Sequence, residues 1–170
     1  PADKKLYALR DVTATVDNFG LISSSIMSKK LAAGSDAIVL DVKVGDGAFM
    51  ENIEDATKLA HMMVEIGNSA GRRTVAAITE MGQPLGCAVG NSIEVIEAIE
   101  TLKCNGPKDI TELALKLSGI MVYLGGKAPS PEAGMEMTKK AMEDGSGLAM
   151  LGEFIEVQGG NPEVINDYSL

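Results

Sequence analysis

Three side chains near the start of the chain, two cations and a hydroxyl, are of types that could take part in binding or catalysis. Arg10 stands beside Asp11 in an otherwise uncharged run. Ser25 and Lys29 follow at a spacing of four residues, which places a hydroxyl and an ammonium one turn apart on one helix face. The same types and spacing are also typical of a salt-bridged arginine, a filler serine and a solvated lysine, and spacing alone does not decide between these interpretations.

A β-α-β unit is predicted after this helix. Residues 37–44 (AIVLDVKV) are β-branched and almost continuously apolar, which is typical of a strand buried on both faces. Apolar residues recur at helical spacing over 53–66, where Gly67 and Asn68 are the expected stop. A second strand is predicted over 73–79, and two strands joined through a helix are expected to pair in parallel.

Helical patterns occupy most of the remaining sequence. They predict helices over residues 21–33, 92–102, 112–124, 131–143 and 148–157. Asp109 or Thr111 is the expected cap of the helix that ends at Leu124. The prediction thus contains about six helices but only two strands. Two doubly buried strands do not form a stable sheet by themselves, because their edges stay open and the core is too small. We therefore expect the chain to be part of a larger protein, with strand edges that favour self-association.

The composition is that of a soluble globular protein. The 170 residues are 45% apolar and 23% charged, which excludes a disordered tail or a disulfide-rich miniprotein. The net charge of −9 argues against binding to nucleic acid or to an anionic membrane. Cys87 and Cys104 match no metal-binding spacing and are expected to be reduced thiols. The chain begins with Pro1 and not with Met, which also suggests a piece of a longer reading frame.

Three stretches of sequence together resemble the pyrimidine-nucleoside phosphorylase and thymidine phosphorylase family. They are YALRDVTATV, SSSIMSKKLAAGSDAIVLDVKVGDGAF, and GRRTVAAITEMGQPLG with the following VGNSIEVIEAIE. The resemblance implies a pentosyltransferase without an organic cofactor, which converts a pyrimidine nucleoside and phosphate into free base and pentose 1-phosphate. It also implies an α/β fold in which residues 1–33 belong to a small all-helical domain and residues 34–170 to a larger domain with a mainly parallel sheet. The junction is expected near Gly34.

The same resemblance assigns roles to seven residues. Arg10 and Lys29 match the pyrimidine-binding arginine and lysine, and Ser25 matches a serine that contacts the base. Fixed cations in a dry cleft would stabilise the negative charge that develops on the leaving base. The family lines its base pocket at positions that match Tyr7, Val16, Ile22 and Phe49, although by sequence alone these four residues are typical of core packing.

A structural potassium ion is also implied by the resemblance. Leu85 and Ala88 match backbone-carbonyl ligands and Glu97 matches a carboxylate ligand, a set of oxygen donors suited to a hard cation. The resemblance further implies a homodimer and a cytoplasmic role in pyrimidine salvage.

Several family features are not in this sequence. The Gly-Thr-x-Asp segment, the phosphate-binding lysine and serine, the active-site histidine and two further cation ligands precede the YALRD motif in the family. The chain is therefore expected to contain the pyrimidine-binding half of the site, no catalytic residue, and no phosphorolytic activity by itself. The turn Gly45-Asp46-Gly47 could present backbone N–H groups to an anion, but a tight connection between strand and helix is the preferred interpretation. His61 is expected to be a solvated side chain without a catalytic role.

Two other functions stay open on the sequence alone. A transferase like anthranilate phosphoribosyltransferase has a related fold, but it would use magnesium and acidic ligands in place of the YALRD motif and the Ser25–Lys29 pair. The second is a non-catalytic helical module whose apolar surface a partner covers.

Overall fold

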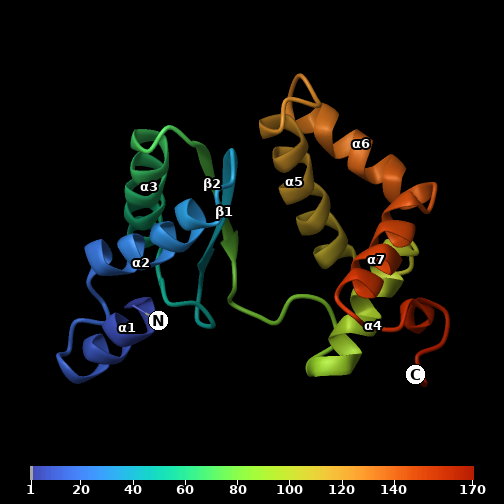
Figure 1. Cartoon of the computed structure of the whole chain (residues 1–170), viewed down its shortest axis with the longest axis horizontal. Helices are drawn as coiled ribbons and strands as arrows, with labels where there is room; N and C mark the ends of the chain where they lie inside the picture. The colour runs from blue at the N-terminus through green and yellow to red at the C-terminus, as the bar shows by residue number, and fades with distance from the viewer. Residues whose placement is uncertain (1) are drawn as a thin grey trace. The chain divides into compact units, whose positions relative to one another are not determined.

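The computed structural model describes residues 2–170, which divide into two compact units. One unit ends at Gln83 and the other comprises Pro84–Leu170 (Figure 1). The described residues form seven α-helices, one 3-10 helix and a two-stranded parallel sheet, so the predicted α/β class is confirmed. None of the described helices is long and apolar enough to cross a bilayer. The junction expected near Gly34 concerns the domains of a longer protein and stays a prediction.

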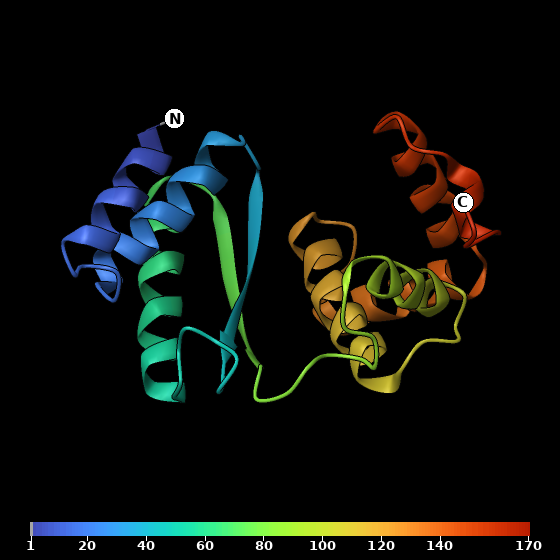
Figure 2. The same ribbon diagram turned by 90° about the horizontal axis from the view of Figure 1, so that it is seen from below.

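The first unit contains three helices and two strands. They are α1 (Ala2–Val12), α2 (Phe19–Ala32), β1 (Ala37–Val44), α3 (Ile53–Ser69) and β2 (Arg73–Glu80). The strands pair in parallel, from Ala37 opposite Arg73 to Val44 opposite Glu80, which confirms the predicted pairing. All three helices lie on the same side of this sheet (Figure 2).

The core of this unit lies between β1 and the helices α2 and α3. Ile38, Leu40 and Val42 alternate along β1 and are buried, whereas Asp41 between them is exposed. Their buried partners are Ile22, Met27, Met50, Ala56, Leu59, Ala60 and Met63. Within this unit the prediction that the strand is buried on both faces is wrong, because the helices of the unit cover only one face of the sheet.

Asparagine caps fix where two of these helices begin. The side chain of Asn18 accepts a hydrogen bond from the Leu21 N–H at 3.0 Å, so α2 starts at Phe19, earlier than predicted. Asn52 accepts a hydrogen bond from the Asp55 N–H at 2.9 Å and caps α3 in the same way.

Helix α3 ends later than predicted because Gly67 has a packing role. The expected stop at Gly67 and Asn68 is wrong, since both residues lie inside the helix. Gly67 is buried against β2, where an added Cβ would lie 2.1 Å from the Oγ1 atom of Thr74. The Asn68 side chain accepts a hydrogen bond from the Thr74 N–H at 3.1 Å. Both residues therefore attach the end of the helix to the start of the next strand.

The described part of the second unit is helical. It contains α4 (Asn91–Leu102), α5 (Lys108–Leu124), α6 (Pro131–Glu143), α7 (Ser146–Val157) and the 3-10 helix η1 (Pro162–Ile165). Helix α5 begins after Pro107, so Asp109 and Thr111 lie inside its first turn and neither is its cap. The Thr111 hydroxyl donates to the Pro107 carbonyl at 2.7 Å, and the Asp109 carboxylate accepts from the Gly86 N–H at 2.9 Å.

Helices α5 and α6 approach closely through two glycines. A Cβ on Gly134 would lie 2.2 Å from the carbonyl oxygen of Gly119, and a Cβ on Gly119 would lie 2.7 Å from the backbone nitrogen of Met135. Only glycine allows this separation, because the contacting atoms belong to the backbone.

Candidate functional site

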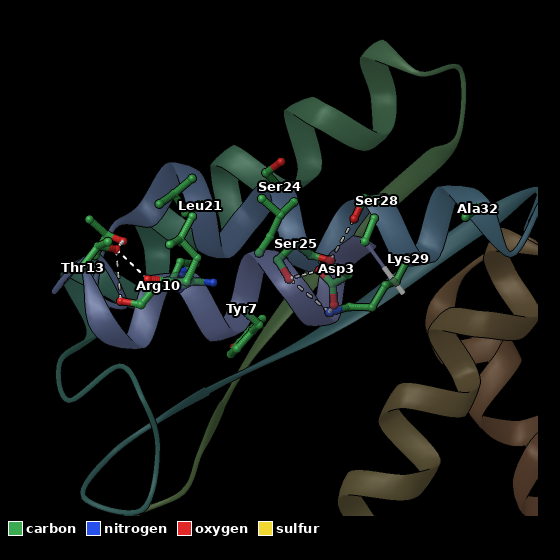
Figure 3. Close-up of a pocket in the computed structure, with 14 residues that line it drawn as sticks. Asp3, Tyr7, Arg10, Thr13, Leu21, Ser24, Ser25, Ser28, Lys29 and Ala32 are labelled. Carbon is green, nitrogen blue, oxygen red and sulfur yellow. Dashed lines mark hydrogen bonds and ion pairs between the residues drawn. The ribbon is translucent and has the colours of Figure 1, made fainter.

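Four of the predicted substrate-binding residues line a cavity between α1 and α2. The cavity has a volume of about 630 Å³, and Tyr7, Arg10, Ser25 and Lys29 form part of its wall. Figure 3 shows Ser25 and Lys29 close to Asp3, a further wall residue that comes from α1. The packing of the two helices therefore brings together side chains that are distant in the sequence.

Asp3, Ser25 and Lys29 form a hydrogen-bonded cluster. The Ser25 hydroxyl donates to Oδ1 of Asp3 at 2.8 Å, and the Lys29 ammonium donates to Oδ2 of Asp3 at 3.0 Å and to Oγ of Ser25 at 3.1 Å. The hydrogen bond from Ser25 and, next, that from Lys29 lower the pKa of the Asp3 carboxyl below its ordinary value. Asp3 is therefore an ionised acceptor that fixes both of its partners.

Arg10 is the buried cation of this site. Its residue is only 6% exposed, and its Nη2 group donates to the carbonyl oxygen of Val16. Within residues 2–170, its Nε and Nη1 atoms are buried and have no hydrogen-bond partner. Its guanidinium carbon lies 4.8 Å from the centroid of the Tyr7 ring, which the Lys29 ammonium approaches to 5.7 Å. Buried N–H groups without partners are rare, which makes Arg10 the candidate donor of this site.

The other predicted residues line a second cavity, of about 520 Å³. Tyr7 and Arg10 border both cavities. The remaining pocket residues of the prediction lie only in the second, namely Val16, Ile22 and Phe49. Ser25 and Lys29 line only the first. The structure thus brings all seven residues to two cavities that share Tyr7 and Arg10, and no single cavity contains them all.

Asp3, Asp41 and Lys43 are among the polar wall residues that sequence reasoning missed. Asp3 precedes Tyr7 by one helical turn, so the helical period of α1 was the signal that could have revealed it. Asp41 and Lys43 of β1 line the second cavity and form an ion pair at 2.7 Å. The Lys43 ammonium also donates to the Thr79 hydroxyl at 3.0 Å. Asp41 and Lys43 are two residues apart on one strand, and this spacing could have shown that they share a face of the sheet.

The residues expected to bind potassium lie in the second unit. The Oε1 atom of Glu97 accepts hydrogen bonds from the backbone N–H groups of Cys87 and Ala88, at 2.8 and 3.0 Å. A Cβ on Gly86 would lie 2.1 Å from the other oxygen, Oε2, so the loop that contains Leu85 and Ala88 wraps closely around this carboxylate. The expected ligand atoms are oxygens, which suits a hard cation. However, Oε1 of Glu97 already accepts two hydrogen bonds from backbone amides.

Side-chain ligands alone do not form a metal site in the described part of the chain. No group of three or more histidine, cysteine, aspartate or glutamate residues among them could hold a metal ion. A cation bound near Glu97 would therefore depend on the backbone carbonyls of Leu85 and Ala88.

Two minor candidates have structural explanations. In the turn Gly45-Asp46-Gly47, the N–H of Gly45 donates to the Met50 carbonyl at 3.0 Å and that of Gly47 to the Met81 carbonyl at 2.9 Å. Both amides are used within the fold, which favours a tight connection. His61 is exposed on α3 and lines neither of the two cavities.

Comparison with known proteins identifies the family. Residues 1–148 match the glycosyl transferase family, a/b domain. The chain belongs to this family. The match covers all of the candidate pyrimidine-binding residues and the three candidate cation ligands.

Curated relatives of this family member are pyrimidine-nucleoside phosphorylases, which confirms the expected resemblance. The chain is 60% identical over 169 residues to the pyrimidine-nucleoside phosphorylase of Geobacillus stearothermophilus, covering 99% of this chain and 39% of that protein. It is 57% identical over 166 residues to the one of Staphylococcus haemolyticus, covering 98% of this chain and 38% of that protein. The relative from Staphylococcus aureus (strain USA300) is 58% identical over 166 residues, with the same two coverages of 98% and 38%. The chain thus spans less than half the length of these relatives.

Proposed function

We propose that this chain carries the pyrimidine-binding part of a pyrimidine-nucleoside phosphorylase, a pentosyltransferase. The observation that carries the proposal is Arg10, a buried cation on the wall of both cavities with two N–H nitrogens that have no partner in the described residues. Pyrimidine bases present ring carbonyl oxygens, which are acceptors suited to such donors. The identity to three relatives with this name supports the same conclusion.

The proposed reaction transfers a pentosyl group from a base to phosphate. The bond between the sugar and the ring nitrogen breaks, its electron pair stays with the base, and a phosphate oxygen bonds to the sugar carbon. Arg10 and Lys29 stabilise the negative charge that develops on the base, and Ser25 contacts the ring. Tyr7 borders both cavities and packs against the ring, and Val16, Ile22 and Phe49 supply the apolar wall of the adjoining cavity. Loss of one such donor typically costs about 3 kcal/mol in the transition state, or a factor of about 100 in rate.

The reaction is tested with the full reading frame that encodes this chain. We expect release of uracil from uridine, or thymine from thymidine, only when inorganic phosphate is present. Arg10→Ala is expected to lower kcat/KM by about 100-fold. Base release that does not depend on phosphate would indicate a hydrolase and contradict the proposal.

Base binding is tested separately on the 170-residue chain. We expect the chain to change the ligand-observed NMR signals of uracil and thymine. Arg10→Ala and Lys29→Ala should each abolish this change. Lys4→Ala is the matched control, since Lys4 is an exposed lysine of α1 outside both cavities. Absence of binding by a folded chain would favour the non-catalytic helical module.

The proposal extends to a potassium ion held by the Leu85 and Ala88 carbonyls and the Glu97 carboxylate. When bound, such an ion would supply a fixed positive charge that orders the loop. Glu97 contributes by holding the loop amides of Cys87 and Ala88 in place.

For the whole protein we propose a homodimer that acts in pyrimidine salvage in the cytoplasm, with phosphate as co-substrate. The name of the relatives supports phosphate as co-substrate, and the other statements rest on the family resemblance alone. The relatives favour this function over an anthranilate phosphoribosyltransferase, which would use acidic magnesium ligands.

A further inference from the structure

The hydrogen bonds of the Asp3–Ser25–Lys29 cluster determine what the cluster can offer a ligand. A serine hydroxyl has one proton and two lone pairs, and an ammonium has three protons. The Ser25 proton is donated to Asp3, and one Ser25 lone pair accepts from Lys29. Lys29 uses a second proton on Asp3. One lone pair on Ser25 and one N–H on Lys29 are left over.

The free lone pair of Ser25 is an acceptor and the free N–H of Lys29 is a donor. The Oγ and Nζ atoms that carry them are about 3 Å apart on the wall of the first cavity. The complement of this pair is a ligand edge with an N–H beside a carbonyl oxygen. Uracil and thymine have such an edge at N3–H and its neighbouring carbonyl groups. Cytosine has the reverse, a bare N3 beside an amino group, and its N3 lone pair would face the Ser25 lone pair.

We propose that Asp3 is a positioning and specificity-determining residue, which fixes the proton of Ser25 so that the site accepts the imide edge of uracil or thymine and rejects cytosine. The inference rests on the proposed function, because it places the base against Ser25 and Lys29. Asp3 acts through Ser25 and does not itself touch the base. The lowered pKa of the Asp3 carboxyl keeps it an acceptor over the physiological pH range.

The substitution Asp3→Asn would reverse this polarity, because an amide has both an acceptor and a donor end. Lys29 has only protons to offer, so the amide oxygen would turn toward Lys29 and the NH₂ group would face Ser25. Ser25 would then accept from the amide, and its own proton would be free for the ligand. A serine that donates suits the bare N3 of cytosine.

The experiment measures kcat/KM for uridine and cytidine with inorganic phosphate, using the full reading frame. We expect the wild-type protein to prefer uridine, and Asp3→Asn to lower the uridine-to-cytidine ratio by at least about tenfold, because discrimination of this kind depends on unpaired polar groups. In a Ser25→Ala background, Asp3→Asn should leave the ratio unchanged, which a merely structural role would not produce. Asp17→Asn is the matched control, since Asp17 is exposed and lines neither cavity.

The wild-type protein gives a second test in case Asp3→Asn does not fold. It should reject 3-methyluridine, which lacks the N3–H, by at least about tenfold relative to uridine. An unchanged ratio in folded Asp3→Asn, or acceptance of 3-methyluridine, overturns the role of Asp3 and leaves the proposed function standing. If no nucleoside shows phosphate-dependent base release, the proposed function fails, and this inference fails with it.

Discussion

At the scale of the residue, Arg10 opposes the stability of the ligand-free chain. A buried donor without a partner costs about 1–3 kcal/mol, and Arg10 has two nitrogens in this condition among the described residues. We predict that Arg10→Met raises the free energy of unfolding by about 1 kcal/mol and abolishes base binding. Urea denaturation and base titration of the same preparation measure both effects. A large loss of stability would mean that Arg10 is a structural residue instead.

Asp3 is expected to give the chain a characteristic pH dependence. Its pKa lies below the ordinary value of 3.8 because the Ser25 hydroxyl and then the Lys29 ammonium donate to it. For a carboxyl whose pKa is lowered by folding, the stabilisation is complete above the ordinary value and disappears as the pH falls through the lowered value. The difference in unfolding free energy between wild type and Asp3→Ala should therefore be constant above about pH 5 and shrink at more acidic pH. A difference that persists unchanged at pH 2 would contradict the contribution of the ionised carboxylate.

At the scale of the element, sequence patterns predicted the elements in which side-chain periodicity and turn residues indicate the same bounds. The strand over 37–44 and the helix over 131–143 have their predicted bounds because side-chain periodicity and flanking turns agree there. Helix α1 was not predicted, although Leu6, Leu9 and Val12 recur at helical spacing. These three side chains are exposed, and Arg10 is the one buried residue of the helix among those described. Asp3 was missed with the helix. The helical period places Asp3 one turn before Tyr7, but the hydrogen bonds that join it to Ser25 and Lys29 connect helices distant in sequence and leave no periodic signal.

Close packing of α5 and α6 leads to a further prediction. Gly119→Ala is expected to destabilise the chain by about 1–3 kcal/mol, because its Cβ would lie 2.7 Å from the Met135 nitrogen. Gly152→Ala in α7 is the matched control, since its Cβ would find ordinary contact, 3.6 Å from Ile165. Thermal unfolding of both variants checks the pair. Equal melting temperatures would show that α5 and α6 can separate without penalty.

The loop around Glu97 gives a prediction about cations. If potassium binds there, the melting temperature should be higher in potassium chloride than in tetramethylammonium chloride of equal ionic strength. Glu97→Gln should remove this difference. Glu153→Gln, an exposed glutamate of α7, should keep it. A difference that survives Glu97→Gln would place the cation elsewhere.

At the scale of the whole molecule, the chain covers 39% of the Geobacillus relative. The resemblance places the phosphate-binding residues in a segment that these 170 residues do not include. We therefore predict that the chain alone binds uracil and releases no base from uridine in the presence of phosphate. A phosphorolysis assay on a preparation of verified intact mass checks this. Turnover by that preparation would mean that phosphate binds to residues described above.

The contact of Gly67 with Thr74 links two positions in the evolution of this family. Because a Cβ added at Gly67 would lie 2.1 Å from the Oγ1 atom of Thr74, the helix position cannot gain a side chain unless the side chain at the strand position becomes smaller or moves. A homologue with alanine at the helix position is expected to have a smaller residue, such as glycine or alanine, at the strand position. The two positions should therefore covary. In each homologue, the sizes of these two residues should indicate how closely the helix between the strands packs against the sheet.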